Sequence, residues 1–254
     1  MKAMALKAMV LAAGLGTRLR PLTNDQPKAL VEVGGRTLLE ITLTRLRDFG
    51  IRDVIINVHH YADMVIDHIK AVGNFGMNIE FSREDVLLDT GGGLKKAAWF
   101  LGGNSSANAD EPFILHNVDV ISSIDLQRMV EVHKQSGALA TLAVQERKTS
   151  RYLLFNEEFQ LCGRRLVKEE KTEIARPSQR MTELAFAGIH VISPRIFPLL
   201  TEEGVFSIVP AYLRLAAQGE KIQAFRADEY YWRDLGKPEN IKQAEQDMKA
   251  NLVR

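Results

Sequence analysis

The first half of the sequence alternates short apolar runs with segments of helical periodicity. The apolar runs cover residues 8–13, 54–58, 77–81 and 113–118. Helical patterns lie at about 37–50, 61–71, after the glycines at 91–93, and at about 124–135. Strands that alternate with helices in this order form a parallel sheet that is covered by helices. The alternation therefore predicts an α/β fold.

The best-marked of these helices lies between Thr37 and Gly50. Thr37 and Glu40 have the spacing of a capping box, in which two side chains bind free N–H groups at the start of a helix. Three leucines within the segment share one face, and Gly50 stands where a terminating glycine is expected. The segment is therefore predicted to be a helix with defined ends.

The second half is predicted to add strands of mixed direction to the same sheet. Strands are expected at 138–145, 185–192, 221–226 and 230–233, a hairpin at 151–155 with 160–163, and helices at 207–217 and from Pro238 onward. Residues 164–182 are polar and are expected to be irregular. Because no linker is visible, we expect a single domain over residues 1–254: a Rossmann-like, mixed, mostly parallel sheet flanked by helices, with a small β-hairpin lid.

Composition excludes several functional classes. The chain has 33 lysines and arginines against 32 acidic residues, a balance that argues against a general nucleic-acid binder. Its single cysteine, Cys162, allows neither an intrachain disulfide nor a cysteine-based zinc site. No apolar run approaches the roughly 18 residues of a membrane span, and the first seven residues do not form a signal peptide. We therefore expect a cytoplasmic protein without a membrane partner, whose first five or six residues are loosely held.

The first apolar run leads directly into a loop that carries the strongest chemical signal. Residues 11–23 read LAAGLGTRLRPLT, and Pro27 and Lys28 follow. Small residues let backbone N–H groups approach a ligand and form an anion-binding nest. Arg18 and Lys28 add two positive charges, which suits a triphosphate. A dinucleotide-binding turn does not fit, because Leu19 stands where its third glycine would be, and no Walker sequence occurs.

The run from Leu11 to Leu30 resembles the signature of the sugar-1-phosphate nucleotidyltransferases, Gly-x-Gly-Thr-Arg-Leu followed by Pro-Lys. This resemblance implies a fold of the GT-A type. It also implies that Arg18 contacts the triphosphate and that Lys28 lies against the reacting phosphates. The remaining nucleotide contacts that it implies in this loop are Leu11, Ala12, Ala13, Gly14, Gly16 and Thr17.

Two aspartates are expected to hold a metal ion. Asp119 directly follows the apolar run that ends at Val118, at the carboxyl edge of the sheet where open α/β folds bind ligands. Asp234 matches a Trp/Phe-x-Asp-x-Gly-x-Pro segment that supplies the second metal ligand in the family. Mg²⁺ prefers carboxylate and phosphate oxygens. One departure is that Asn117 and Val118 precede Asp119 where the family more usually has glycine, and the larger side chain could shift the backbone.

Residues 88–94, LDTGGGL, form a third motif. Glycines at the mouth of a helix leave room for a flat base, and by resemblance Thr90, Gly91 and Glu84 contact the base. The motif is similar to that of the N-acetylmuramate-1-phosphate uridylyltransferases, which favours uridine. Related mannose- and heptose-phosphate enzymes use guanosine nucleotides with similar loops.

The sugar side is less clear in the sequence. By resemblance, sugar contacts are expected from Asn117, Tyr152, Glu183 and Gly188. Lys168 is a candidate ligand for the sugar phosphate, although its charged surroundings are more typical of exposed surface. Residues of about 7–136 would then form the nucleotide-binding half, and residues of about 137–254 the sugar-binding half.

The resulting hypothesis is a Mg²⁺-dependent enzyme that joins a nucleoside triphosphate to a sugar 1-phosphate and releases pyrophosphate. A UDP-sugar is the favoured product and a GDP-sugar the next. Two alternatives stay open: a cytidylyltransferase that acts on a non-sugar phosphate, and a regulatory homologue that binds nucleotide sugars without catalysis. The sequence is also compatible with a homo-oligomer.

Overall fold

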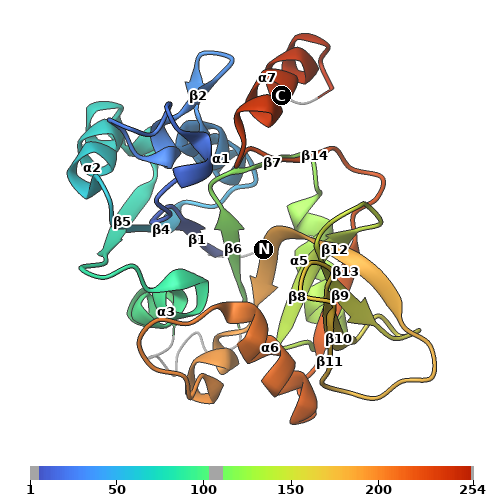
Figure 1. The fold of residues 1–254 in the computed structure, drawn as a ribbon. Coiled ribbons are helices and arrows are strands. Elements are labelled where there is room, and N and C mark those ends of the chain that lie inside the picture. The colour runs from blue at the N-terminus through green and yellow to red at the C-terminus, as the bar shows by residue number, and fades with distance from the viewer. Residues whose placement is uncertain (1–5, 103–110, 253–254) are drawn as a thin grey trace.

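One large sheet organises the chain, whose computed structural model describes residues 6–102 and 111–252 (Figure 1). Its main path runs in the order β11-β10-β9-β12-β6-β1-β4-β5; β8 branches from β12, and β13 pairs with β8. The strands are β1 (Lys7–Leu11), β4 (Asp53–Val58), β5 (Asn78–Arg83), β6 (Phe113–Asn117), β8 (Ala140–Gln145), β9 (Arg151–Phe155), β10 (Leu161–Leu166), β11 (Lys171–Ile174), β12 (Thr182–Ile192) and β13 (Ile222–Arg226). The expectation for residues 1–5 lies outside the described residues.

The strands of the first half are parallel, as their alternation with helices predicts. β1 pairs in parallel with β4 and β6, and β4 pairs in parallel with β5. The last residue of β1, Leu11, stands in register with Asn57 on β4 and with Asn117 on β6. The carboxyl ends of these three strands therefore meet at one edge of the sheet.

The strands of the second half continue the same sheet, mostly in antiparallel pairs. β12 is antiparallel to β6, β8 and β9, while β13 is parallel to β8. The predicted hairpin is present as β9 and β10, and it forms the outer part of the main sheet. The expectation that residues 164–182 are irregular is wrong for β11, an edge strand paired with β10. The α/β fold with a mixed sheet and flanking helices is confirmed.

The helices begin and end largely where the sequence predicts. They are α1 (Leu38–Asp48), α2 (Ala62–Ala71), α3 (Asp89–Lys96), α4 (Ala98–Leu101), α5 (Leu126–Ser136), α6 (Ile208–Ala217) and α7 (Pro238–Lys249). The Thr37 hydroxyl accepts a hydrogen bond from the N–H of Glu40, 3.0 Å away, and Gly50 has a φ of 84°. The helix expected after the three glycines instead begins at Asp89 and contains them.

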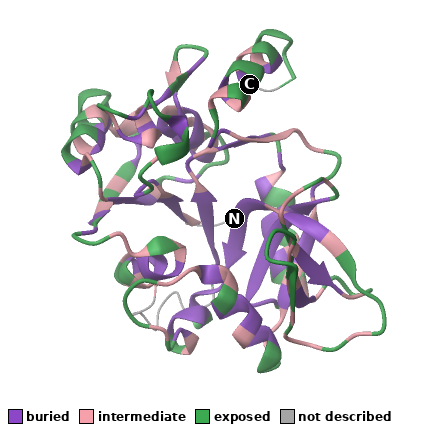
Figure 2. Cartoon of the chain, viewed as in Figure 1, coloured by how far each residue is buried: buried purple, intermediate pink, exposed green. Residues whose placement is uncertain are grey.

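Helices bury both faces of the sheet (Figure 2). Ala8 and Val10 of β1 face a core formed with α1, α2 and α5, while Met9 faces a second core formed with α3, α4 and α6. All three of these β1 residues are fully buried, so the strand reads as a continuous apolar run. No described helix has both the length and the apolar character that a membrane crossing requires.

Two short sheets complete the architecture. β2 (Glu32–Val33) pairs with β3 (Arg36–Thr37), just before α1. β14 (Trp232–Asp234) pairs with β7 (Val120–Ser122), which follows β6 after a turn. The second pair brings the end of the chain back to the carboxyl edge of the main sheet.

Candidate active site

Three adjoining cavities lie at the carboxyl edge of the parallel strands. The first cavity has a volume of about 340 Å³ and its lining includes Leu11, Ala12 and Ala13. The second, of about 230 Å³, lies toward β12 and β14, and the third, of about 190 Å³, lies against the loop of residues 14–19. Gly14 and Lys28 line both the first and the third, while Asn117 and Asp119 line both the first and the second. The three cavities therefore meet around Lys28 and Asp119.

A buried chain of hydrogen bonds holds the start of the loop. The Ala12 N–H donates to Oδ1 of Asn57 over 2.7 Å, and Nδ2 of Asn57 donates to Oε1 of Glu84 over 2.7 Å. The second oxygen of Glu84 accepts from the N–H of Leu88 at 2.9 Å. Glu84 is 2% exposed, and the described lining of the first cavity includes Asn57 but not Glu84. The structure thus places Glu84 behind Asn57, outside the described lining of the first cavity.

Sequence reasoning missed Asn57, although a signal was available. It is an asparagine within a buried apolar strand, and such a polar side chain normally has a hydrogen-bonding partner. Its register with Leu11 becomes visible only once the order of the strands is known.

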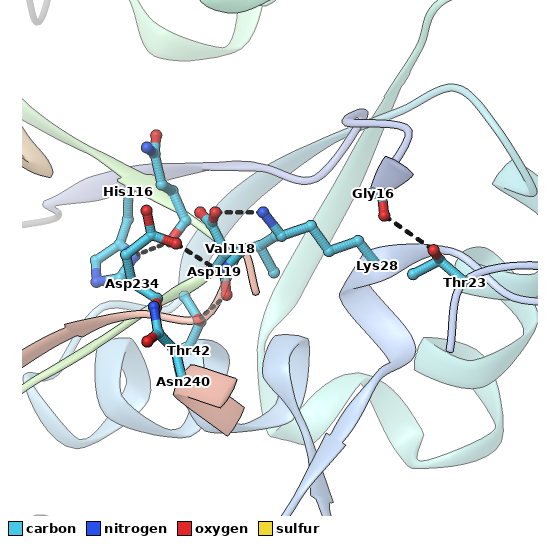
Figure 3. A network of polar contacts seen from close by, with 11 residues as sticks. Gly16, Thr23, Lys28, Thr42, His116, Val118, Asp119, Asp234 and Asn240 are labelled. Carbon is cyan, nitrogen blue, oxygen red and sulfur yellow. Dashed lines mark hydrogen bonds and ion pairs between the residues drawn. The ribbon is translucent and has the colours of Figure 1, made fainter. Parts of the chain in front are cut away.

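Gly16 lets the loop fold back onto Lys28. Its φ of 65° lies in the left-handed region, and a Cβ there would stand 3.0 Å from Cβ of Lys28. The Thr23 hydroxyl donates to the Gly16 carbonyl at 2.9 Å, which holds the return of the loop (Figure 3). Gly14, in contrast, has open space where a side chain would project. The loop therefore presents backbone to the first and third cavities.

Asp119 and Asp234 come together although they are far apart in sequence (Figure 3). Asp234 pairs with Val120 in the short β7–β14 sheet, and the N–H of Leu235 donates to the carbonyl of Asp119 at 2.8 Å. Both aspartates line the second cavity. The Lys28 ammonium forms an ion pair with the carboxylate of Asp119.

The departure at Asn117 and Val118 is accommodated by burial. Val118 is 4% exposed and packs into the core, and its N–H donates to the Leu11 carbonyl at 3.2 Å. Asp119 then occupies the turn between β6 and β7. The large side chain before the aspartate is thus packed mainly into the core, although Val118 also contributes to the lining of the first cavity.

Arg18 reaches the same place from the loop. It is exposed and lines the third cavity together with Thr17 and Gly236. A Cβ at Gly236 would stand 2.6 Å from Nη2 of Arg18 and 2.7 Å from Oδ1 of Asp234. Glycine at 236 therefore lets the guanidinium group and the carboxylate approach each other.

The three glycines of α3 have a different role from the one that their sequence suggests. Leu87, Asp89 and Thr90 line the first cavity, but Gly91 does not belong to its described lining. A Cβ at Gly91 would stand 2.3 Å from the Phe206 ring, and the Gly91 N–H donates to the Phe206 carbonyl at 2.9 Å. The space into which side chains at these positions would project is filled by protein, mainly by Gly204, Phe206 and the Asn57–Glu84 pair.

This packing brings a residue from the second half of the chain to the first cavity. Val205 lines the cavity and is 60% exposed, although it precedes α6. The simple division into a nucleotide-binding half of 7–136 and a sugar-binding half of 137–254 therefore omits one contributor. No pattern around Val205 indicated it, because its position depends on contacts with the glycines of α3.

The second cavity contains some of the predicted sugar contacts. Asn117 and Gly188 line it. Gly188 has a φ of 75° where the pairing of β12 shifts register, and a Cβ there would stand 2.9 Å from Nδ2 of Asn117. Glycine is thus required both by the backbone conformation and by close packing.

Other predicted sugar residues lie elsewhere. Glu183 forms an ion pair with Arg165 at 2.7 Å, and the guanidinium of Arg165 lies 5.4 Å from the Tyr152 ring centre. Neither Tyr152 nor Glu183 belongs to the described lining of the second cavity, and Lys168 is exposed between β10 and β11. Tyr152 nevertheless reaches the edge of the cavity, because its hydroxyl accepts from the N–H of Thr149, a lining residue, at 3.3 Å. Residues that the sequence did not indicate line the cavity instead: Arg147, Thr149, Arg151 and Trp232.

The side chains at this edge suit a hard cation that also binds substrate oxygens. Among the described residues, no group of three or more histidine, cysteine, aspartate or glutamate side chains could enclose a metal. Two carboxylates at the edge of a phosphate-sized cavity fit Mg²⁺, which usually keeps several water or phosphate ligands. His116 is not part of this set, because it is 1% exposed and its Nδ1 lies 2.8 Å from the Asn117 carbonyl. Burial, together with the charge of Arg45, lowers its pKa to about 3.

Comparison with known proteins identifies the family of this chain. The model of the nucleotidyl transferase family matches residues 7–251. The chain is 35% identical over 241 residues to the N-acetylmuramate alpha-1-phosphate uridylyltransferase of Caulobacter vibrioides, covering 91% of this chain and 92% of that protein. It is 30% identical over 242 residues to the mannose-1-phosphate guanyltransferase of Yarrowia lipolytica, covering 93% of this chain but only 62% of that longer protein.

Solved structures share the fold at lower sequence identity. HddC from Yersinia pseudotuberculosis, complexed with GMP-PN, superposes with a TM-score of 0.73 at 23% identity, covering 96% of this chain and 99% of that one. A UDP-glucose pyrophosphorylase complexed with UDP-glucose gives a TM-score of 0.74 at 18% identity, covering 98% and 100%.

The family match spans nearly the whole chain, and the relatives act on nucleotides and sugar phosphates. The chain therefore belongs to the nucleotidyl transferase family and is a sugar-1-phosphate nucleotidyltransferase.

Proposed function

We propose that this protein transfers a uridylyl group from UTP to a sugar 1-phosphate, forming a UDP-sugar and pyrophosphate, with GTP as the next best donor. The observation that carries the proposal is the meeting of three cavities at Lys28 and Asp119. Three cavities that meet at one point can hold the three groups of one reaction side by side: the nucleoside, the leaving pyrophosphate and the attacking sugar phosphate.

The first cavity is suited to the nucleoside. Ala12, Ala13 and Gly14 offer backbone, and Leu87 with Val205 offers apolar surface for a flat ring. The Asp89 carboxylate also lines this cavity. A carboxylate that faces the ring nitrogen would favour uracil and guanine, which carry an imino N–H there, over cytosine and adenine, which carry a lone pair. The uridylyltransferase activity of the Caulobacter relative, which is similar over nearly its whole length, supports uracil.

The third cavity is suited to the leaving pyrophosphate. Arg18 supplies a guanidinium group that can bind phosphate oxygens in pairs, and Gly14, Gly16 and Thr17 supply the surrounding loop. Lys28 lies on the boundary with the first cavity. Its ammonium group can therefore reach the phosphates on either side of the bond that breaks.

Asp119 and Asp234 would hold Mg²⁺ at the second cavity, and the bound ion would reduce the negative charge on the two reacting phosphates. Asn117 and Gly188 would lie along the sugar. Lys28, which pairs with Asp119, adds a positive charge where the substrates meet. Both substrates are anionic, so these charges oppose the repulsion that otherwise keeps them apart.

The reaction would be an in-line displacement. An oxygen of the sugar 1-phosphate forms a bond to the α-phosphorus of the triphosphate, while the bond from that phosphorus to the bridging oxygen of the β-phosphate breaks. The electron pair leaves with pyrophosphate. The attacking oxygen is already ionised at neutral pH, so no general base is needed, and catalysis rests on positioning and charge stabilisation.

The test is pyrophosphate release by the purified protein from UTP and a panel of sugar 1-phosphates. Asp119→Asn and Arg18→Ala are each expected to lower the rate about 10²- to 10³-fold, the usual cost of losing a group aimed at transition-state charge. Asp63→Asn is the matched control, because Asp63 is an exposed carboxylate paired with Arg83 at 2.6 Å. Wild-type rates for Asp119→Asn would show that the metal assignment is wrong.

A further inference from the structure

The second cavity contains two guanidinium groups to which the proposed reaction gives no role. Arg147 is half-buried, and Arg151 is exposed at the start of β9. Both line the cavity together with Thr149. Lys168, the candidate phosphate ligand that the sequence offers on this side, is exposed in the turn between β10 and β11 and does not belong to the described lining. The positive charge of this cavity therefore comes from two arginines.

Arg147 is held in one place beside the proposed metal ligands. Its guanidinium carbon lies 3.7 Å from the centre of the Trp232 ring, and Nη2 donates to the Phe186 carbonyl at 2.7 Å. The Trp232 ring is itself fixed, because Nε1 donates to the Ala187 carbonyl at 2.7 Å. Asp234 lines the same cavity and stands two residues after Trp232 on β14, so this guanidinium lies at the end of the cavity where the phosphates react. Arg147 is therefore placed to bind the 1-phosphate of the sugar substrate.

Arg151 is positioned differently. Within the described part of the chain its guanidinium makes no hydrogen bond, ion pair or ring contact. Its backbone is fixed by the pairing of β9 with β10, and its N–H donates to the Thr149 hydroxyl at 3.3 Å. Arg165 on the neighbouring strand provides the contrast, because it is paired with Glu183 at 2.7 Å. The guanidinium group of Arg151 is thus available to bind an anionic group of a ligand in the second cavity.

The remaining lining is poor in groups that would bind a neutral sugar. Each sugar hydroxyl both donates and accepts hydrogen bonds. The described lining contains no carboxylate besides Asp119 and Asp234, which the proposed reaction assigns to the metal. Asn117 and Thr149 can both donate and accept, but with both aspartates assigned to the metal, no anionic side chain of the described lining remains to balance the two guanidinium groups. Such a surface is matched by an anion, since charge-assisted hydrogen bonds are stronger than neutral ones.

We infer that the sugar 1-phosphate accepted by this enzyme carries a second acidic group, a carboxylate or a phosphate, and that Arg151 binds that group while Arg147 binds the 1-phosphate. This inference rests on the proposed function. It narrows the substrate class from sugar 1-phosphates in general to acidic ones.

The test compares sugar 1-phosphates that differ only in the acidic group. N-acetylmuramate 1-phosphate is compared with N-acetylglucosamine 1-phosphate, glucuronate 1-phosphate with glucose 1-phosphate, and glucose 1,6-bisphosphate with glucose 1-phosphate. With UTP as donor, kcat/KM is expected to be about 10- to 100-fold higher for the acidic member of at least one pair, the factor typical of one charge-assisted hydrogen bond. Titration calorimetry of the same sugar phosphates gives a binding readout that does not depend on turnover.

Arg151→Gln distinguishes the second acid from the phosphate that both members share. The variant is expected to lose the preference, with kcat/KM falling for the acidic substrate and changing less than about threefold for its neutral partner. Arg165→Gln is the control, because its guanidinium is paired outside the cavity, and it should retain the preference.

Three results would overturn the inference. Equal kcat/KM values for the acidic and neutral members of every pair would show that no second acid is recognised. An equal loss for both members in Arg151→Gln would assign Arg151 to the 1-phosphate. Absence of pyrophosphate release from every triphosphate and sugar phosphate would instead refute the proposed function, and this inference with it.

Discussion

Glu84→Gln is the substitution that most sharply tests how the nucleotide loop is held. In the wild type, the two carboxyl oxygens of Glu84 accept from two different donors, Nδ2 of Asn57 at 2.7 Å and the N–H of Leu88 at 2.9 Å. A glutamine of the same size has only one oxygen, so one of these donors would face an amide NH₂ group. Rotating the Asn57 amide would not restore the missing hydrogen bond. The Ala12 N–H donates to Oδ1 of Asn57 at 2.7 Å, and after the rotation it would face Nδ2 instead.

The expected loss of stability follows from burial. Glu84 is 2% exposed, so water cannot replace the missing acceptor. One buried donor without a partner typically costs about 1–3 kcal/mol, and the upper part of that range applies because bonds to a carboxylate are stronger than neutral ones. The free energy of unfolding of Glu84→Gln should therefore fall by about 2–3 kcal/mol.

Urea denaturation of the ligand-free protein at pH 7 measures this loss. Glu80→Gln is the matched control, since Glu80 is exposed on the same strand and its replacement should change the free energy of unfolding by less than about 0.5 kcal/mol. Because Glu84 acts on the base of the loop, Glu84→Gln should also raise KM for all nucleoside triphosphates by a similar factor. Unchanged stability with a KM effect confined to one base would mean that Glu84 contacts the base directly, and the reasoning would be refuted.

Three further predictions concern the neighbouring structure. Gly91→Ala places a methyl group 2.3 Å from the Phe206 ring, so it should destabilise the protein by about 1–3 kcal/mol and raise KM for the triphosphate; a thermal melt and a KM equal to those of the wild type would contradict this. The wild type should prefer UTP and GTP to CTP and ATP, and Asp89→Asn should weaken that preference, because an amide can donate as well as accept; a wild type that uses CTP as well as UTP would exclude the assigned role of Asp89. Burial lowers the pKa of His133 to about 4, so the unfolded chain takes up a proton first as the pH falls below about 6.5. The buried, neutral His133 side chain therefore contributes fully to the free energy of unfolding above that pH, and this contribution is lost progressively as the pH falls toward 4. His133→Gln should reduce the pH dependence of the unfolding free energy over this interval by about 3 kcal/mol, and parallel curves for the two proteins would contradict the burial argument.

Elements that depend on local pattern could be predicted from the sequence. The parallel strands β1, β4 and β6 follow from apolar runs that are buried on both faces, and α1 follows from its Thr37 cap and Gly50 stop. The loop from Gly14 to Lys28 could be located because glycines directly after a buried strand, followed by an arginine and a lysine, are typical of a phosphate-binding loop. β11 could not be predicted, because it is an exposed edge strand with little apolar content.

Features that depend on distant segments could not be derived. The glycines of α3 suggest room for a base, yet the space into which side chains there would project is filled in part by Gly204 and Phe206. Val205 reaches the first cavity only through that packing. Glu183 lies on β12, the strand that also carries Gly188 of the second cavity, but its side chain pairs with Arg165. In each case the deciding contact joins parts of the chain that no local pattern relates.

The most direct test of the central claim is a double-mutant cycle on Asp119 and Asp234, read as kcat for pyrophosphate release. Asparagine is the suitable replacement, because its oxygen can still accept the Gly236 N–H that now lies 2.5 Å from Oδ1 of Asp234. If both carboxylates hold one ion, each single variant should lose about 10²- to 10³-fold, and the double variant should be about as slow as the slower single variant. Losses that multiply in the double variant, or an Asp234→Asn variant with the wild-type kcat, would contradict the account.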